Sequence, residues 1–185
     1  MSEPTKPATG ARPTSADWSG AGLWDFSISL YGREPVRKIC LALQESFAAD
    51  VNLILYCLWL GATGRGQIDG DTFAHLSEAV SVWQKEVVVP LRAARVRLRK
   101  PPRSVSPNAA GALRDQIKEI EFAAERIELD VLADSLVRSP VAHDPERCQR
   151  DMTSSLTTYL DFIGAPASED TADAIAKLVE ECTAG

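Results

Sequence analysis

Two long rows of apolar residues recur in steps of three and four, and a segment with three prolines separates them. The first row comprises Phe73, Leu76, Val80, Trp83, Val87, Leu91, Ala94 and Leu98, and the second comprises Leu113, Ile117, Ile120, Ala124, Ile127 and Val131. Such steps place each row on one face of an α-helix. The first row keeps its phase across Pro90, which predicts one long helix kinked there. Because the segment KPPRSVSPN is long enough to reverse the chain, the sequence predicts a long antiparallel helical hairpin.

The rest of the chain also has a helical period, so we predict an all-α, single-domain bundle of about six to seven helices. Residues 51–62 are apolar almost all round, which predicts a buried central helix against which the hairpin packs. Asp50 and Ser168 stand where N-caps are expected. The helices outside the hairpin are expected at 22–32, 34–47, 51–62, 144–162 and 168–182.

The chain of 185 residues suits one domain. Residues 1–21 carry Pro4, Pro7 and Pro13 among small polar residues, which predicts a disordered N-terminal arm before a helical domain over 22–185. The helices from about 144 onward are the less strongly patterned part of that domain. There is no signal-like apolar stretch at the start, and the longest apolar run has eight residues, so neither secretion nor a membrane span is expected. A cytoplasmic location follows, in which the four cysteines stay reduced.

Charge is unevenly distributed along the chain. The sequence has 20 Lys plus Arg and 26 Asp plus Glu, a net charge of -6, which makes nucleic acid an unlikely partner. Residues 92–118 nevertheless contain eight basic residues and one acid, and the hairpin would gather them at its tip. Such a tip can hold an anion or an acidic protein face, or can simply be a solvated helix end. The candidate surface comprises Arg92, Arg95, Arg99, Lys100 and Arg103.

A second candidate lies at the start of the central helix. Asp50 and Asn52 flank that start, and Tyr31, Arg33 and Tyr56 could complete a pocket with a polar end and an aromatic wall. Such a pocket would take a small ligand, and an anionic one is possible because of the arginine. The alternative is that Asp50 and Asn52 only satisfy free backbone groups at the helix end.

Signatures of catalysis are missing from the sequence. The glycine-rich segment GATGRGQIDGD has no Gly-Lys-Ser/Thr, and the cysteines have no zinc-like spacing. His75 and His143 have no neighbouring set of metal ligands. We therefore predict no catalytic residue, no cofactor and no metal site.

Several short stretches resemble a known family. They are WDFS at Trp24–Ser27, LALQ at Leu41–Gln44, ADVNLILYCLWLG at Ala49–Gly61, Trp83, and PLR at Pro90–Arg92. The sequence is similar in these stretches, over roughly 24–135, to a proteobacterial family of small cytoplasmic proteins that is named only as a domain of unknown function. The resemblance implies a bacterial, helical domain. It implies no activity and carries no catalytic residues over to this chain.

Two functional hypotheses follow. The leading one is a non-catalytic protein-interaction or regulatory module whose partner is another protein or a second copy of the chain, as in a homodimer. The alternative is a protein or enzyme that binds a small anionic ligand in a pocket near the helices at 31–56.

Overall fold

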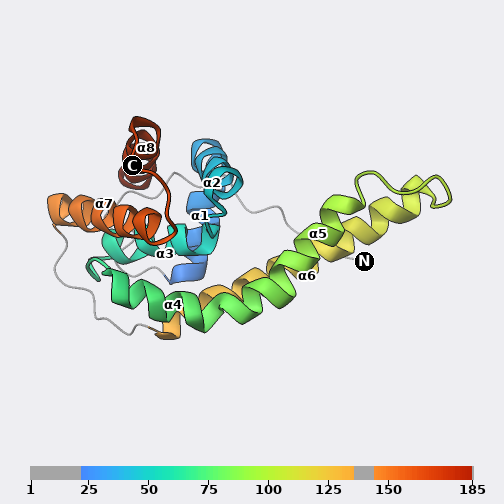
Figure 1. Cartoon of the computed structure of the whole chain (residues 1–185), viewed down its shortest axis with the longest axis horizontal. Helices are drawn as coiled ribbons and strands as arrows, with labels where there is room; N and C mark the ends of the chain where they lie inside the picture. Colours follow the sequence, from blue (N-terminus) through green and yellow to red (C-terminus); the bar gives the residue numbers. More distant parts are fainter. Residues whose placement is uncertain (1–21, 136–143, 185) are drawn as a thin grey trace, which may run out of the picture.

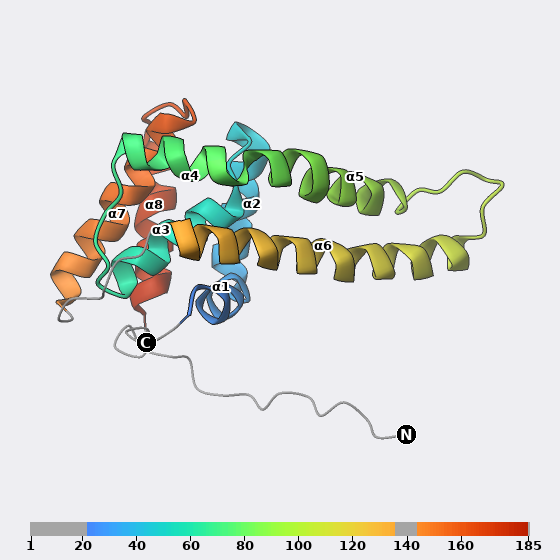
Figure 2. The same ribbon diagram turned by 90° about the horizontal axis from the view of Figure 1, so that it is seen from below.

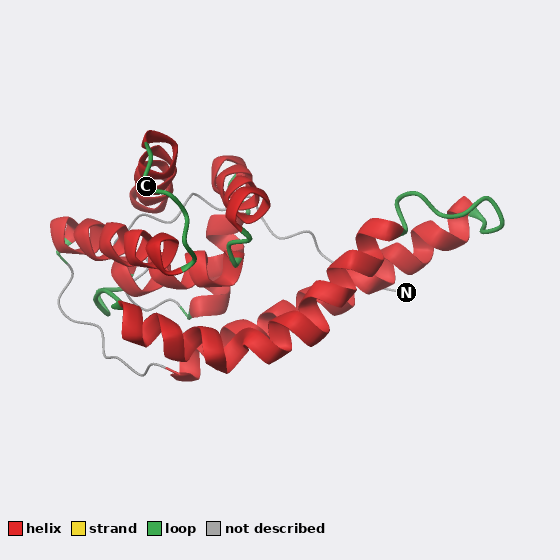
Figure 3. Cartoon of the chain, in the orientation of Figure 1, coloured by secondary structure: helices red, strands yellow, loops and turns green. Residues whose placement is uncertain are grey.

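The computed structural model describes residues 22–135 and 144–184, and this part of the chain is helical with no strand (Figure 3). The disordered arm predicted at 1–21 and His143 lie outside the described residues. The elements, in chain order, are α1 (Leu23–Tyr31), α2 (Glu34–Phe47), α3 (Val51–Ala62), α4 (Gly70–Trp83), the π-helix η2 (Gln84–Val88), α5 (Val89–Arg97), α6 (Pro107–Ser135), α7 (Pro145–Phe162) and α8 (Glu169–Thr183). The all-α prediction is confirmed.

The helix ends follow the capping signals. The Asp50 carboxylate accepts a hydrogen bond from the backbone N–H of Asn52, and the Ser168 hydroxyl accepts one from Thr171. Both bonds satisfy amides that the first turn of a helix leaves free. The two N-caps predicted from the sequence are therefore confirmed, and they fix where α3 and α8 begin.

Helix α3 is the central element of the core. Every residue from Asn52 to Ala62 is buried, and α3 packs chiefly against α7, with α1 on another side. Gly61 allows the close approach of α7, since a Cβ on it would lie 2.7 Å from the backbone nitrogen of Met152. Real Cβ atoms do not come so close, so only glycine fits this crossing without a shift. The prediction of a buried central helix is confirmed.

Helices α4, η2 and α5 follow one another without a break and run antiparallel to α6 as a long hairpin (Figures 1 and 2). The base of the hairpin packs on the body through α3, α1 and α7. The far half extends away from the body, and α5 contains no buried residue. The irregular segment predicted at Pro90 is the π-helix just before it; proline has no N–H to continue the regular ladder.

The apolar row of α6 is divided between two environments. Ala124 is buried and Ile117 is half-buried, whereas Leu113, Ile120, Ile127 and Val131 are exposed. The face of α6 that packs inward carries Ala110, Glu121, Ala124, Glu128, Leu129 and Leu132. Glu121 on this face pairs with Arg92 and Arg95 of α5, and the exposed members of the apolar row lie away from it. No helix in the described ranges is long and apolar enough to cross a membrane.

Candidate functional site

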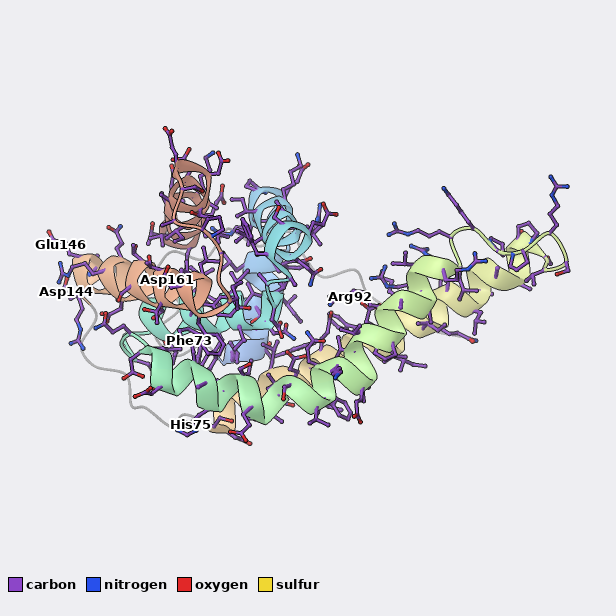
Figure 4. All side chains as sticks on the ribbon, viewed as in Figure 1. Phe73, His75, Arg92, Asp144, Glu146 and Asp161 are labelled. Atoms are coloured by element: carbon purple, nitrogen blue, oxygen red, sulfur yellow. The ribbon has the colours of Figure 1, made fainter. Side chains whose placement is uncertain are left out.

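The five basic residues of the candidate surface divide into two groups. Arg92 donates to Glu121 (3.1 Å) and Glu125 (2.7 Å), and Arg95 also donates to Glu121. These pairs tie α5 to α6 midway along the hairpin, where Figure 4 labels Arg92. Both arginines are thus bound to carboxylates rather than free for an external anion.

Glu121 is the centre of this network. Its side chain is 6% exposed. Burial alone would raise the pKa of Glu121, but the hydrogen bonds from Arg95 and Arg92 hold it below the ordinary value. Burial also raises the pKa of Glu125, and Arg92 only partly offsets that effect. The network therefore acts as a structural clamp between the two helices of the hairpin.

The other three basic residues lie at the free end. Arg99, Lys100 and Arg103 are exposed in the turn between α5 and α6, and they form no ion pair with any described residue. We call them the basic tip. Figure 1 shows this end as the point farthest from the body. Of the surface predicted from the sequence, this part alone is open to a partner.

A second exposed feature runs along α6. Six residues in alternating steps of four and three are all exposed, and we call them the outer seam: Ala109, Leu113, Gln116, Ile120, Ala123 and Ile127. The three large members are 47%, 55% and 47% exposed in chain order. Steps of this kind form the contact line between two helices. Here that line has no partner among the residues that the structure describes.

The five residues of the predicted pocket do not come together. Arg33 donates to the carbonyls of Glu181 and Ala184 (3.3 Å for the latter) at the end of α8. Tyr56 is fully buried against Trp59, with ring centroids 5.7 Å apart.

Tyr31, at the end of α1, lies near the pair of Glu125 and Arg92. Burial raises the pKa of its hydroxyl, and the charge of Glu125 adds to that effect. Asp50 and Asn52 lie together at the start of α3, where the Asn52 N–H donates to the Asp50 carboxylate.

Around Asp50 lies a buried polar cluster that the sequence did not predict. The Tyr159 hydroxyl accepts a hydrogen bond from the backbone N–H of Asp50 (2.7 Å), and the Gln84 side-chain amide donates to its carboxylate (3.0 Å). Asn52 completes the first turn of α3 beside it. Glu128 of α6 lies at this cluster, fully buried. The cluster joins α3, η2, α6 and α7 at the base of the hairpin.

Glu128 determines the chemistry of the cluster. Its two oxygens are buried and make no hydrogen bond of normal geometry, although Asp50 and Asn52 lie close enough to act on it. Burial and, after it, the nearby charge of Asp50 together raise the pKa of Glu128 to about 9. The Glu128 carboxyl is therefore protonated at neutral pH. A site so rich in acceptors and in acid does not favour an anionic ligand.

Two hollows in the described part of the chain lie away from this cluster. One is a surface depression lined by α7 alone, from Glu146 to Ser154. The other, of about 210 Å³, lies between α3, α7 and α8 beside Cys148 and Met152. That volume is below the usual range for ligand pockets. Neither hollow reaches Asp50.

The sequence held a signal for the residues that we missed. Glu121, Glu125 and Glu128 recur in steps of four and three, and Arg92 and Arg95 stand at the matching height of the antiparallel partner. Acids and bases at such spacing can pair across a hairpin. Gln84 and Tyr159 gave no comparable signal, because their role depends on how α7 crosses the start of α3.

His75, which the sequence analysis considered as a metal ligand, lies away from the cluster around Asp50. It is exposed on α4, whereas Phe73 on the same helix packs on Tyr159 of α7, with ring centroids 5.4 Å apart (Figure 4). Within 22–135 and 144–184, no group of three or more histidine, cysteine or acidic residues is arranged to hold a metal ion.

Comparison with known proteins gives a family and no activity. A family described as "Protein of unknown function (DUF2390)" matches residues 22–132, more than half of the chain. The match spans α1 to α5 and most of α6, and it leaves α7 and α8 outside, although α7 covers α3 and supplies Tyr159. No curated protein and no solved structure matches the chain. The chain, with its buried α3 and its projecting hairpin, belongs to the DUF2390 family of proteins of unknown function.

Proposed function

We propose that the chain is a non-catalytic protein-interaction module that docks a partner protein on its hairpin. The observation that carries the proposal is the exposure of the outer seam along α6 together with the unpaired basic tip. Leu113, Ile120 and Ile127 are large apolar residues that follow one line of α6, and about half of each side chain is exposed. A helix laid along that line would bury them, which is the common way in which helices recognise each other.

The basic tip suits a protein better than a nucleic acid. Proteins that bind single-stranded nucleic acid usually combine basic residues with aromatic rings on which the bases stack. Residues 98–106, which include the basic tip, contain no aromatic residue. The net charge of -6 also opposes a polyanion. A protein partner with a few acidic side chains needs no stacking aromatic residue and is not repelled as strongly as a polyanion. We place this activity in the reducing cytoplasm, because the thiols of Cys40 and Cys57 are buried on separate helices.

A charge-reversal experiment tests the proposal. In the tip variant, Arg99, Lys100 and Arg103 are replaced by Glu. In the matched control, the same change is made at three exposed basic residues of the body: Arg37, Arg150 and Lys177. All six side chains are exposed, so both variants should unfold at the same temperature as the wild type.

Each protein is used to capture its partners from extracts of the source cells. The affinity of every captured protein for the three forms is then measured with purified components. The proposal predicts that the tip variant loses a partner protein that the control variant retains. Equal capture by the wild type, the control and the tip variant would contradict it.

A further inference from the structure

The outer seam has the pattern of an antiparallel helix pair. Its members alternate between short or polar side chains and long apolar ones in the order Ala109, Leu113, Gln116, Ile120, Ala123 and Ile127. The other edge of the same helix, through Ile117 and Ala124, is already packed in the hairpin. From Ala109 to Ile127 the seam rises by 18 residue steps, or about 27 Å at ~1.5 Å per residue. This is long enough for a helix of equal length to lie along it.

We propose that the seam pairs with the seam of a second copy of this chain. The two α6 helices run antiparallel about a two-fold axis that crosses the seam at the height of Lys118 along the helix. This proposal deepens the proposed function, because it rests on the hairpin being a docking surface and names the partner. It leaves open whether the basic tip binds anything else.

Shape selects one register of this pair. When the axis lies at the height of Lys118, each long seam residue of one copy faces a shorter one of the second copy. The pairs are Leu113 with Ala123, Ile120 with Gln116, and Ile127 with Ala109. Each long side chain then meets a shorter one, which lets the two helices interdigitate. A shift that sets Ile120 opposite itself puts long chains against long ones and leaves gaps elsewhere. A shift by one heptad in one direction places Leu113 against Asp130, a buried charge, and in the other direction leaves Ile127 opposite Pro102, outside α6.

Charge selects the direction. The basic tip lies at one end of the hairpin, and the exposed Asp130 and Asp134 lie at the other end of α6. Antiparallel pairing brings Arg103 of each copy to the level of these two acids. Parallel pairing would place two basic tips side by side, where like charges repel. Between the ends, Ala109, Ala123 and Gln116 keep charge out of the contact.

The body leaves room for the second copy. Figure 2 shows one side of α6 with no other helix in front of it from the tip to the base. This agrees with the exposure of all six seam residues. The clamp from Arg92 and Arg95 to Glu121 lies on a different face of α6, so pairing does not disturb it.

Cysteine cross-linking of the full-length protein tests the register. The variant L113C/A123C should form a covalent dimer under mild oxidation, because each new thiol faces its counterpart on the other copy. The variants L113C and A123C alone should not, because the antiparallel register holds two copies of one position about 15 Å apart. A disulfide needs Cα atoms within about 7 Å. The four native cysteines are buried and do not compete.

A second double variant, L113C/Q116C, is the matched control, with two seam thiols that do not face each other in this register. Dimer formed by L113C/A123C alone supports the proposal. A dimer of L113C by itself would mean parallel pairing, equal cross-linking of all variants would mean random collision, and the absence of any dimer would mean that the chain does not pair. Each of these three results overturns the inference. The docking function is judged separately, by whether the wild type captures a different protein that the tip variant loses, because the covalent dimer contains only copies of this chain.

Discussion

Replacing Glu128 by Gln should stabilise the protein at neutral pH, although the residue is fully buried at the junction of four helices. The reason is the proton that the folded state must hold. Burial and the charge of Asp50 raise the pKa of the Glu128 carboxyl to about 9, from an ordinary value of 4.5. Glutamine has nearly the same shape and, like the protonated acid, can donate to Asp50. It needs no proton from solvent.

The magnitude follows from proton linkage. Between pH 4.5 and about 9 the folded state binds a proton that the unfolded state has released, so stability falls as the pH rises through this window. Each pH unit costs ~1.4 kcal/mol, and pH 7 lies ~2.5 units above the ordinary value, which gives up to ~3 kcal/mol. Below pH 4.5 both proteins are neutral at this position, and the difference vanishes. The figure is an upper bound, because it assumes that Glu128 alone carries the whole difference in proton binding.

Urea unfolding of the wild type and of E128Q at pH 5, 7 and 8.5 gives the test. We expect a small difference at pH 5 and a growing advantage of the variant at the higher two values. E119Q, an exposed position on the same helix, should show no such trend. If E128Q were less stable than the wild type at pH 7, or if its advantage were the same at every pH, the reasoning about a buried neutral acid would be wrong.

Three further outcomes are expected. Gly61→Ala should lower the free energy of unfolding by ~1–3 kcal/mol, because its Cβ collides with the Met152 backbone; an unchanged urea midpoint would contradict this. Tyr159→Phe should cost ~1–3 kcal/mol by leaving the Asp50 N–H without its acceptor, and amide exchange at Asp50 should quicken. Glu121→Gln should destabilise at neutral pH. Because pairing with arginine lowers the pKa of Glu121, the wild type loses its extra stability over the variant as the pH falls through that lowered pKa. If the wild type and Glu121→Gln unfolded identically in acid, the clamp would be refuted.

The elements of the fold could be predicted from the sequence because their signals are local. The spacing of apolar residues marked α2, α3 and the hairpin, and Asp50 and Ser168 marked where helices begin. An N-cap depends only on residues within one helical turn, so the start of a helix can be predicted without knowing the rest of the fold.

The orientation of α6 could not be predicted in the same way. Its heptad spacing identifies an apolar line but does not say whether that line meets the body or solvent. The ion pairs of Arg92 with Glu121 and Glu125 help to fix the orientation, and they depend on contacts between distant segments. For the same reason the pocket expected around Asp50 included Arg33, which instead binds the end of α8.

The molar mass of the purified full-length chain, measured by light scattering over a range of concentrations, tests the central claim most directly. We predict a mass that rises toward twice 20.1 kDa for the wild type and for L41K, a change at an exposed body position. The seam variant I120K should stay at 20.1 kDa, because it brings two charges into the contact. A wild type that remains at 20.1 kDa at every concentration, or an I120K variant that still dimerises, would contradict pairing through the outer seam.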